Sequence, residues 1–571
     1  MRNLFFFFNC FVWCLIATTS SVVLFSQTTP NSPPKSEQHR VKPVKTVTKL
    51  LGTIPALTTI PEIASQHQTL NKKKLMQFHN NKLRNYRNNP NPLPIGEDPV
   101  RQKGQWRDGE NEIDTVLYVE GLAYIDIHPP DPSGDVGPNH YIQMVNSASG
   151  SVIQIWDKEM NLLYGPSTLN NIWQQIGAPV GIGDPIVSYD QAADRWVLLE
   201  MTWEGKLNIA VSKTADPLGE WYAYVMQGDG SLPDYPKLSI WNNFYYITTN
   251  EFNNYSPIYV LNRQEMIDGV STAQTLLFKI PKFIPGPPVE SFQPGIPVDW
   301  DGKNTPPANM PGMVMRMYDD AWNGDVDKLE IWDVIVDWSD VDKAEVVGPF
   351  DLPTEPFEAQ VCEGWFTCID QPDGGPAFEA LDQIIHMRAQ YRNFGSYQSI
   401  VLNHVVDATG TEIAGKRWYE LRKLTSAGGE WYIYQQGTYA PDDESRFMGS
   451  IAMDGTGNIA LGYAVAGFNT YPSLRLTGRM AGDPLGQMTV KEVTVGEGKV
   501  VNLGQRWGDY SHMTVDPVDE QTFWFTGEYL PEGSNGTTWA TKIIAFTLRR
   551  DTNDLAMQAI VNPYSKGQLT T

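Results

Sequence analysis

The chain has 571 residues and a formal net charge of −23. Hydrophobic residues make up 41% of it and charged residues only 19%, which excludes a disordered chain. So acidic a chain lacks the basic face that a phosphate backbone requires, which argues against nucleic-acid binding. The 48 Gly, 41 Pro, 18 Trp and 25 Tyr indicate many tight turns and aromatic strands, and therefore β structure.

Residues 1–26 are predicted to be a signal peptide. Arg2 precedes an apolar run over residues 4–17, and the polar residues 18–21 interrupt it. The run is short for a membrane span of about 20 residues, so cleavage is favoured over an anchoring helix. The segment predicts a secreted or cell-surface protein that meets the membrane only through this peptide.

Residues 27–112 are predicted to be a basic, low-complexity linker. Residues 1–103 hold 14 Lys/Arg against 4 Asp/Glu, whereas the rest of the chain holds 29 against 62. A basic arm therefore precedes a strongly acidic body. A solvated tether is the favoured interpretation, and contact with an acidic partner or a cell-surface polymer is the alternative.

Residues 113–550 contain an internal repeat. Segments that begin at Asp184, Asp234 and Asp509 share an Asp, a short strand, a polar turn, an aromatic strand and a Glu, and weaker copies begin at Asp135 and Gly449. A period of 50 to 60 residues with four short strands is typical of a β-propeller blade. Strand-rich stretches near residues 300 and 384 complete seven units, or six if one is an insertion. We therefore predict an all-β propeller of four-stranded antiparallel blades; a stacked β-sandwich is the alternative.

The repeated acids are the first candidate site. Asp135, Asp184, Asp234 and Asp509 are expected on the innermost strands, where they would surround one mouth of the channel. They could cap backbone amides between blades or hold Ca²⁺. Asp184, Asp234 and Asp509 are also candidate catalytic acids for glycoside hydrolysis, which needs two carboxyl groups. Because the acid recurs in several blades, the structural interpretation is favoured.

Arginines near strand starts are the second candidate site. Arg392, Arg446 and Arg506 precede or join short Gly-containing motifs. Gathered on one face, they could clamp the carboxylate of a ligand. Pairing with nearby Asp residues is the favoured interpretation.

Two local patterns and a set of loop aromatics complete the candidate residues. The loop that contains Asp319, Asp320, Asp325 and Asp327 has the acidic content of a calcium loop, but it lacks EF-hand spacing and a solvated turn is the favoured interpretation. Cys362 and Cys368, six positions apart in an exported chain, predict a disulfide. The candidate ligand-contacting aromatics in loops are Trp203, Trp322 and Trp365.

The motifs at 134–141, 183–190, 234–238 and 506–511 resemble a largely uncharacterised group of exported bacterial β-propeller proteins, often labelled sialidase-like. The resemblance covers about residues 115–550 and implies a propeller at the cell exterior, with no established reaction. The S-x-D-x-G-x-x-W motif of true sialidases is missing. Residues 551–571 are similar to the first strand of a truncated Ig-like, adhesion-type module.

The sequence thus favours a secreted or surface-displayed binding module for carbohydrate or protein, with calcium as the candidate cofactor. A glycoside hydrolase that uses carboxylates at the channel mouth is one alternative. A structural spacer of an adhesin is another.

Overall fold

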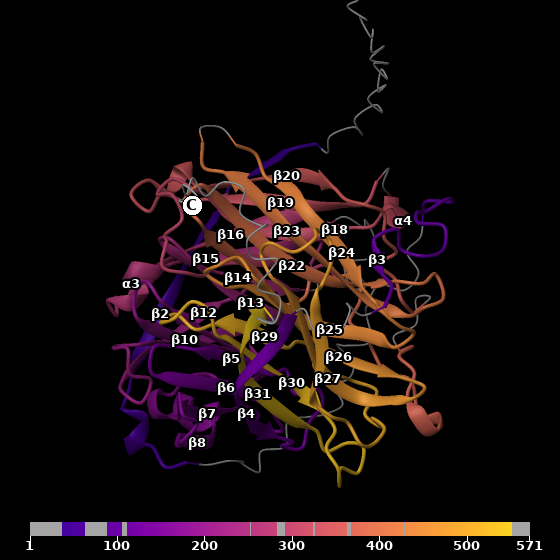
Figure 1. Cartoon of the computed structure of the whole chain (residues 1–571). Helices are drawn as coiled ribbons and strands as arrows, with labels where there is room; N and C mark the ends of the chain where they lie inside the picture. The colour runs from indigo at the N-terminus through magenta and orange to yellow at the C-terminus, as the bar shows by residue number, and fades with distance from the viewer. Residues whose placement is uncertain are drawn as a thin grey trace, which may run out of the picture. The chain divides into compact units, whose positions relative to one another are not determined.

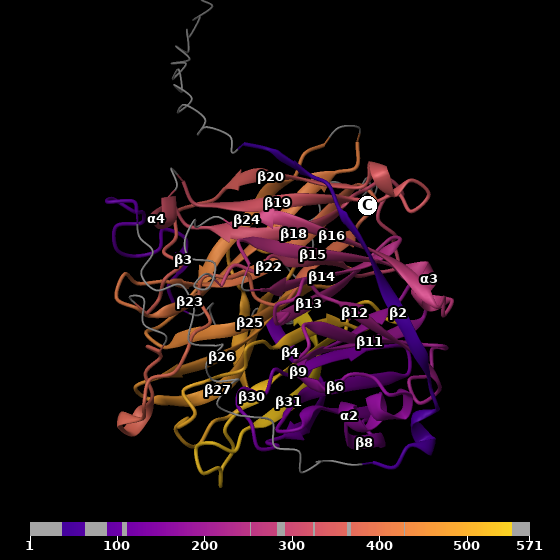
Figure 2. The same cartoon turned by 180° about the vertical axis from the view of Figure 1, so that it is seen from behind.

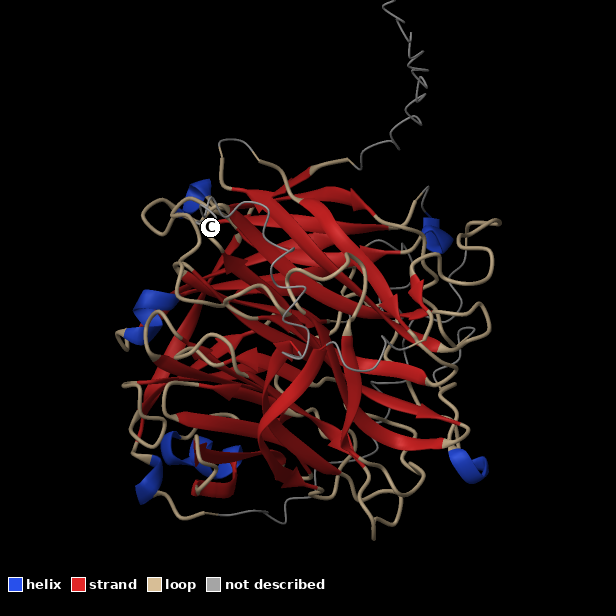
Figure 3. Ribbon diagram, in the orientation of Figure 1, coloured by secondary structure: helices blue, strands red, loops and turns tan. Residues whose placement is uncertain are grey.

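The described strands of this computed structural model form five sheets, of 10, 9, 4, 4 and 4 strands (Figure 1). Apart from β1, β2 and β3, these strands divide into seven groups of four, antiparallel within each group. The structure describes residues 37–62, 88–104, 111–251, 253–282, 292–323, 326–362, 367–426 and 429–550, all within the compact unit Ser36–Thr571. The predicted all-β class is confirmed, and the short helices lie between strands (Figure 3).

Each group is called a unit here and numbered along the chain. Unit 1 is β5 (Ser133–Val136), β6 (His140–Ser147), β7 (Gly150–Asp157) and β8 (Leu162–Thr168). Unit 2 is β9 (Gly181–Asp190), β10 (Arg195–Thr202), β11 (Lys206–Ser212) and β12 (Trp221–Gln227). Unit 3 is β13 (Asp234–Trp241), β14 (Phe244–Asn250), β15 (Tyr255–Asn262) and β16 (Thr272–Pro281).

The remaining units follow the same pattern. Unit 4 is β17 (Ile296–Trp300), β18 (Gly312–Tyr318), β19 (Lys328–Ile335) and β20 (Glu345–Pro353). Unit 5 is β21 (Ala389–Asn393), β22 (Tyr397–Asp407), β23 (Ala414–Leu424) and β24 (Tyr432–Tyr439). Unit 6 is β25 (Ser445–Met453), β26 (Ile459–Gly467), β27 (Thr470–Arg479) and β28 (Val490–Gly496). Unit 7 is β29 (His512–Val515), β30 (Phe523–Tyr529), β31 (Ala540–Arg550) and, from earlier in the chain, β4 (Asn111–Ala123).

The first strands of the units form a closed ring. Each contacts the first strand of the next unit, from β5 through β9, β13, β17, β21, β25 and β29, and β29 contacts β5. Unit 7 joins both ends of the body, because β4 pairs with β31 from Ala123 opposite Ala540 to Asn111 opposite Arg550. A ring leaves no terminal apolar sheet face to cover.

The hydrophobic core lies largely between neighbouring units. Trp241 of unit 3, for example, shares a cluster with Val314 and Trp332 of unit 4. The aromatics that the repeat places on second strands, Trp196, Tyr245 and Trp524, are at most 3% exposed. Alternate strand residues thus fill the spaces between units, as period-2 patterning requires.

An N-terminal arm runs around the outer edges of the units. β1 (His39–Val41) pairs with β20, and β3 (Arg101–Gln102) pairs with β24. Figure 2 shows β2 (Val44–Ile54) on the outside, where it pairs with both β12 and β16 and so joins units 2 and 3. All three strands fall within residues 27–112, the range assigned above to a linker.

The short helices connect or flank these strands. They are η1 (Leu57–Thr59), α2 (Leu169–Trp173), η2 (Gln174–Ile176), α3 (Arg263–Ile267), α4 (Asp320–Asn323), η3 (Val341–Lys343) and η4 (Pro372–Gly374). Within the described ranges, no helix has the length and apolar character needed to cross a bilayer. The predicted signal peptide and the C-terminal segment 551–571 lie outside these ranges.

The positive charge of the arm is met by the body itself. Arg40 lies 2.6 Å from Glu345, and Lys45 lies 2.6 Å from Asp342. These pairs are exposed, so each contributes little to stability. They show that the charges of the arm and the body are complementary, because a basic strand lies against the rim of an acidic body.

Candidate functional site

A group of buried charged side chains occupies one end of the ring, where the first strands begin. We call it the hub, and it consists of Asp131, Asp184, Asp234, Lys237, Arg506 and Asp509. Asp131, Asp184 and Asp509 have φ values of 47°, 52° and 58°. Asp is among the few residues that tolerate this left-handed conformation, which accounts for an Asp at these three positions near the start of a first strand.

Asp131 is the hub acid that the sequence analysis missed. Asp131-Pro132 leads into β5 as Asp184-Pro185 leads along β9, and this shared dipeptide was the signal that could have identified it. The sequence alignment used Asp135 instead, four positions further on. The repeat copy in unit 1 was therefore out of register by four residues.

The hub acids differ in their partners. Asp184 Oδ2 accepts a hydrogen bond from the Tyr235 N–H at 3.0 Å, and Asp509 Oδ1 accepts one from Arg506 at 2.5 Å. Asp234 Oδ2 lies 3.4 Å from the Asn250 amide. Neither oxygen of Asp131 accepts a hydrogen bond from an N–H or O–H group of the described residues, although the side chain is only 1% exposed.

Burial raises the pKa of three hub carboxyls, those of Asp131, Asp184 and Asp234. The pKa of Asp131 lies well above its usual value because of burial and the nearby charges of Asp509 and Asp184. Burial and the charge of Asp509 raise the pKa of Asp184, and burial and the charge of Asp184 raise that of Asp234. A neutral Asp131 carboxyl can donate a hydrogen bond to Asp184. This accounts for the absence of N–H or O–H groups that donate to Asp131.

Lys237 provides a positive charge near these acids. Its ammonium lies 3.3 Å from the centre of the Tyr235 ring and 4.0 Å from that of Tyr510, and it donates to the Pro236 carbonyl at 3.1 Å. Burial lowers the pKa of Lys237 to about 8, against the opposing effect of the hub acids. The two aromatic faces partly replace the water that this cation has lost.

Asp135 belongs to a different level of the ring. Its Oδ2 accepts from the Tyr189 N–H of unit 2 at 2.7 Å, as Asp299 Oδ1 of unit 4 accepts from the Ile240 N–H of unit 3 at 2.8 Å. Burial raises the pKa of Asp135 to about 7, although the charge of Arg388 lowers it. Asp135, Asp184 and Asp299 therefore all link one unit to the backbone of another, which is the capping role that the recurrence favoured.

The three predicted ligand-binding arginines are all paired with acids. Arg392 lies 3.2 Å from Asp301, and Arg446 binds Asp442 at 2.6 Å and Glu492 at 2.9 Å. Arg506 contacts both Glu379 and Asp509. Each of the three side chains pairs with different acids, and only Arg506 belongs to the hub. A joint carboxylate clamp thus has no geometric support, because each guanidinium is already neutralised inside the fold.

Three of the four predicted metal ligands come together in unit 4. Asp319, Asp320 and Asp327 are buried, and one carboxylate oxygen of each lies within 4.8 Å of those of the other two. Backbone N–H groups of Ala321, Ala359 and Phe357 orient Asp319 and Asp327 at 2.7–2.9 Å. Burial raises the pKa of Asp327 to about 8 and that of Asp319 well above its usual value, which Glu358 and Asp327 raise further. Asp325 lies outside the described residues.

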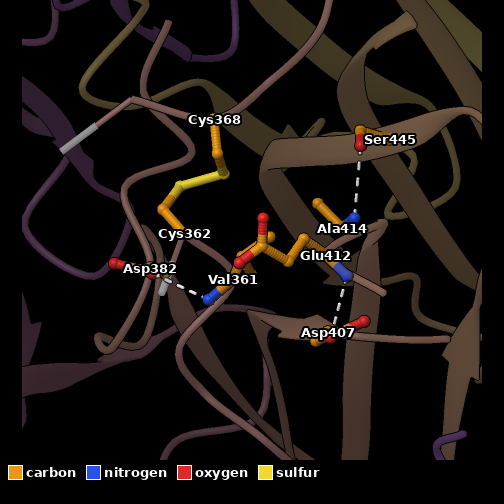
Figure 4. The surroundings of a disulfide bond; sticks show 8 residues. All are labelled: Val361, Cys362, Cys368, Asp382, Asp407, Glu412, Ala414 and Ser445. Carbon is orange, nitrogen blue, oxygen red and sulfur yellow. Dashed lines mark hydrogen bonds between the residues drawn. A yellow bond between two sulfur atoms is a disulfide. The ribbon is translucent and has the colours of Figure 1, made fainter. Parts of the chain in front are cut away.

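The predicted disulfide between Cys362 and Cys368 is present. Their Cα atoms are 5.1 Å apart, within the range of ordinary disulfides. Figure 4 shows the bond beside Val361, whose N–H donates to Asp382 at 3.0 Å.

The loop aromatics give mixed results. Trp203 is partly buried and packs against the core, and Trp322, expected to be exposed, is only 3% exposed. Trp322 is buried because it lies in α4 and packs edge-on against Tyr318. Trp365 lies outside the described residues.

A second aromatic group, which the sequence analysis did not identify, lies at one end of unit 5. We call it the aromatic stack: Phe394, Tyr397, Arg422, Tyr432 and Tyr434. The rings of Phe394 and Tyr397 are stacked with centres 4.9 Å apart, and the Arg422 guanidinium lies 4.2 Å from the Tyr397 ring and 3.4 Å from the Tyr434 ring. Tyr432 is 41% exposed. No repeat pattern marks these residues, so only the strand pairing reveals the group.

Comparison with known proteins identifies no family. No protein-family profile matches the chain, and no curated protein does. Among solved structures, an α-L-arabinofuranosidase from Podospora anserina in complex with cellotriose is 10% identical (80% of this chain, 98% of that chain, TM-score 0.27). The WD40 domain of SCAP from fission yeast is 7% identical (76% and 98%, TM-score 0.33), and an ulvan lyase of polysaccharide lyase family PL25 is 11% identical (79% and 84%, TM-score 0.28). These TM-scores are too low to support an argument about function, which therefore rests on the geometry described above.

Proposed function

We propose that the chain is an exported β-propeller whose seven units are its blades, and that it acts as a binding module for carbohydrate. The aromatic stack at the end of unit 5 is the observation that carries this proposal. The closed ring of first strands supports the propeller. The disulfide supports an oxidising compartment, where such bonds persist.

The chemistry of the aromatic stack suits a sugar. A pyranose ring has an apolar C–H face and a hydroxyl rim, and binding sites for such ligands combine aromatic surface with a few polar groups. Tyr397, Tyr432 and Tyr434 supply aromatic rings with hydroxyl groups. Arg422 adds hydrogen-bond donors, and its charge is balanced by Glu420 at 2.5 Å. The near-neutral patch favours an uncharged glycan over an anionic one.

Substitution of the stack should abolish glycan binding. Tyr397→Ala and Tyr432→Ala are each expected to weaken binding at least about tenfold, because exposed aromatic anchors dominate such contacts. Tyr471→Ala, which removes a partly exposed tyrosine of unit 6, is the matched control and should bind normally. Calorimetric titration against a panel of oligosaccharides measures the effect. Unchanged affinity in both stack variants would contradict the assignment of the surface.

The hub supports glycoside hydrolysis as a second candidate function. Asp131 is a buried carboxyl with a raised pKa near two other acids, which is how a general acid is prepared. If Asp184→Asn and Asp509→Asn each abolish turnover of a glycan while the fold persists, the hydrolase is established. Saturable binding without turnover leaves the binding module. A chain that does neither is a structural spacer.

Calcium is proposed to bind at Asp319, Asp320 and Asp327. Oxygens that share a Ca²⁺ ion lie about 2.3–2.6 Å from it, and the 4.8 Å spacing of these three carboxylates fits that requirement. Ca²⁺ is expected to raise the melting temperature by several degrees, since a ligand that binds only the folded state stabilises it.

Differential scanning fluorimetry with and without a chelator measures this shift. Asp327→Asn should remove it, whereas Asp337→Asn, which alters a nearby exposed acid, should retain it. A melting temperature that does not respond to calcium or to chelation would reject the site.

A further inference from the structure

A buried lysine and an asparagine whose amide has no hydrogen-bond partner lie together at the boundary of units 5 and 6. Lys416 of β23 and Asn403 of β22 are both 0% exposed. Neither the oxygen nor the nitrogen of the Asn403 amide has a hydrogen-bond partner. Buried polar groups are almost always paired, so an unpaired amide that contacts the same glycine as a buried lysine requires an explanation.

The strand register places both side chains on one face. Val405 is opposite Lys416 and Asn403 is opposite Trp418, so Asn403 and Lys416 are diagonal neighbours on the antiparallel pair. Both pack against Gly449 of β25. A Cβ atom at Gly449 would lie 3.0 Å from Asn403 Oδ1 and 3.1 Å from Lys416 Nζ. The amine and the amide therefore adjoin one point, and only glycine leaves room for them.

His386 fixes the direction of proton transfer. The Gly449 N–H donates to His386 Nδ1 at 3.1 Å, so this nitrogen carries a lone pair. Its Nε2 lies 2.8 Å from the Leu381 carbonyl oxygen and therefore carries the hydrogen. Lys416 Nζ lies 3.0 Å from Nδ1 and donates to it. His386 is thus placed to accept a proton from the lysine nitrogen.

The environment favours an uncharged lysine. Burial holds the pKa of Lys416 well below its usual value, and no carboxylate opposes this effect. A neutral, desolvated amine is a nucleophile, whereas an ammonium is not. Because the sheet already holds the two groups near each other, the reaction avoids the entropic cost of bringing two reactants together.

From this geometry we propose that Lys416 and Asn403 join in an intramolecular isopeptide bond. Lys416 Nζ attacks Cγ of Asn403, the new N–C bond forms, and the Cγ–Nδ2 bond breaks. His386 takes a proton from the attacking nitrogen and returns it to the departing Nδ2, which leaves as ammonia. No oxidant or cofactor takes part, and the product is a secondary amide.

The bond would stabilise unit 5 where it adjoins unit 6. It replaces a buried amine and an unpaired amide with one amide, and it joins β22 to β23 covalently. The inference is independent of the proposed carbohydrate binding, because it concerns the opposite end of these strands from the aromatic stack.

Peptide mapping of the purified full chain by tandem mass spectrometry tests the bond. The expected result is one cross-linked pair of peptides that contains Asn403 and Lys416, lighter by about 17 Da, the mass of ammonia, with no tryptic cleavage after Lys416. Intact mass alone does not decide, since an N-terminal glutamine also loses ammonia on cyclisation. Linear peptides with an intact Asn403 amide and cleavage after Lys416 would overturn the proposal.

Variants of Lys416, Asn403 and His386 test the role of each residue in forming the cross-link. Lys416→Met and Asn403→Leu should show no cross-link, and His386→Asn should slow its formation at least about tenfold, the scale of general-base catalysis. Lys423→Met, on the same strand, is the control and should cross-link fully. If the substituted chains fail to fold, a second experiment uses the wild-type chain. The chain is recovered in the unfolded state, and its peptides are mapped before and after refolding. Cross-linking before refolding, or none after it, would contradict a reaction that the folded geometry promotes.

Discussion

A chain that lacks residues 37–62 is expected to lose most of its stability and to aggregate. This deletion removes β2, which pairs with β12 over residues 48–54 and with β16 over residues 44–49. Both outer edges would then be exposed, and unpaired strand edges recruit other chains. The deletion also removes Ile54, Leu57 and Ile60, which are at most 4% exposed and pack against Trp173 and Trp221.

Single substitutions separate the edge effect from the packing effect. Leu57→Ala and Ile54→Ala should each lower the free energy of unfolding by about 2–5 kcal/mol, the usual cost of truncating a buried aliphatic side chain. Leu51→Ala in the same strand is the control, because Leu51 is 37% exposed, and it should change stability by less than about 0.5 kcal/mol. Chemical denaturation and light scattering measure these effects. A monomeric deletion variant with unchanged stability would show that the arm is a dispensable tether.

Stability is expected to fall as the pH rises from about 5 to about 8. Burial raises the pKa of Asp135 and of Glu200 to about 7 in the folded chain. In the unfolded chain these carboxyls regain pKa values near 4, so the folded state binds more protons between these limits. Raising the pH therefore favours unfolding across this window. Each unit of difference in pKa corresponds to about 1.4 kcal/mol per carboxyl.

Glu200→Gln isolates one of these groups. Glu200 is 0% exposed, and its Oε2 accepts from Trp173 Nε1 at 2.6 Å, a bond that the glutamine oxygen can keep. The variant should match the wild type near pH 5 and exceed its melting temperature near pH 8, since it has no charge to bury. Lys158 pairs with Asp516 at 2.7 Å near the surface, and Asp516→Asn is the control that should leave the slope unchanged. A wild-type slope of the opposite sign would contradict the assignment.

Stabilisation by calcium is expected to depend on pH. Protonation competes with cation binding at Asp319 and Asp327, because both carboxyls have raised pKa values. Calcium should therefore stabilise the chain more at pH 8 than at pH 5, against the trend of the chain without calcium. Measuring both trends in one experiment distinguishes metal binding from simple titration.

The repeat, read from the sequence, indicated where five of the units begin, and two strand-rich stretches that fit its period indicated the others. The expected starts at 135, 184, 234, 300, 384, 449 and 509 lie in or close to β5, β9, β13, β17, β21, β25 and β29. Period-2 patterning and turn residues are local properties, and they suffice to place strands. The disulfide and the acidic loop at 319–327 were also predictable, because their residues are close together along the chain.

Other features depend on contacts between distant residues. Asp131 rather than Asp135 belongs to the hub, because the register of β5 against β9 decides which acid faces the other hub acids. The arm at 44–54 looks like a linker until the edges of β12 and β16 complete its pairing. The pairing of Arg392 with Asp301, and the meeting of Lys416 and Asn403 beside Gly449, follow from how units 4 to 6 pack. The amino-acid order determined the strands and the repeat, and the packing of one unit on the next decided which polar side chains meet.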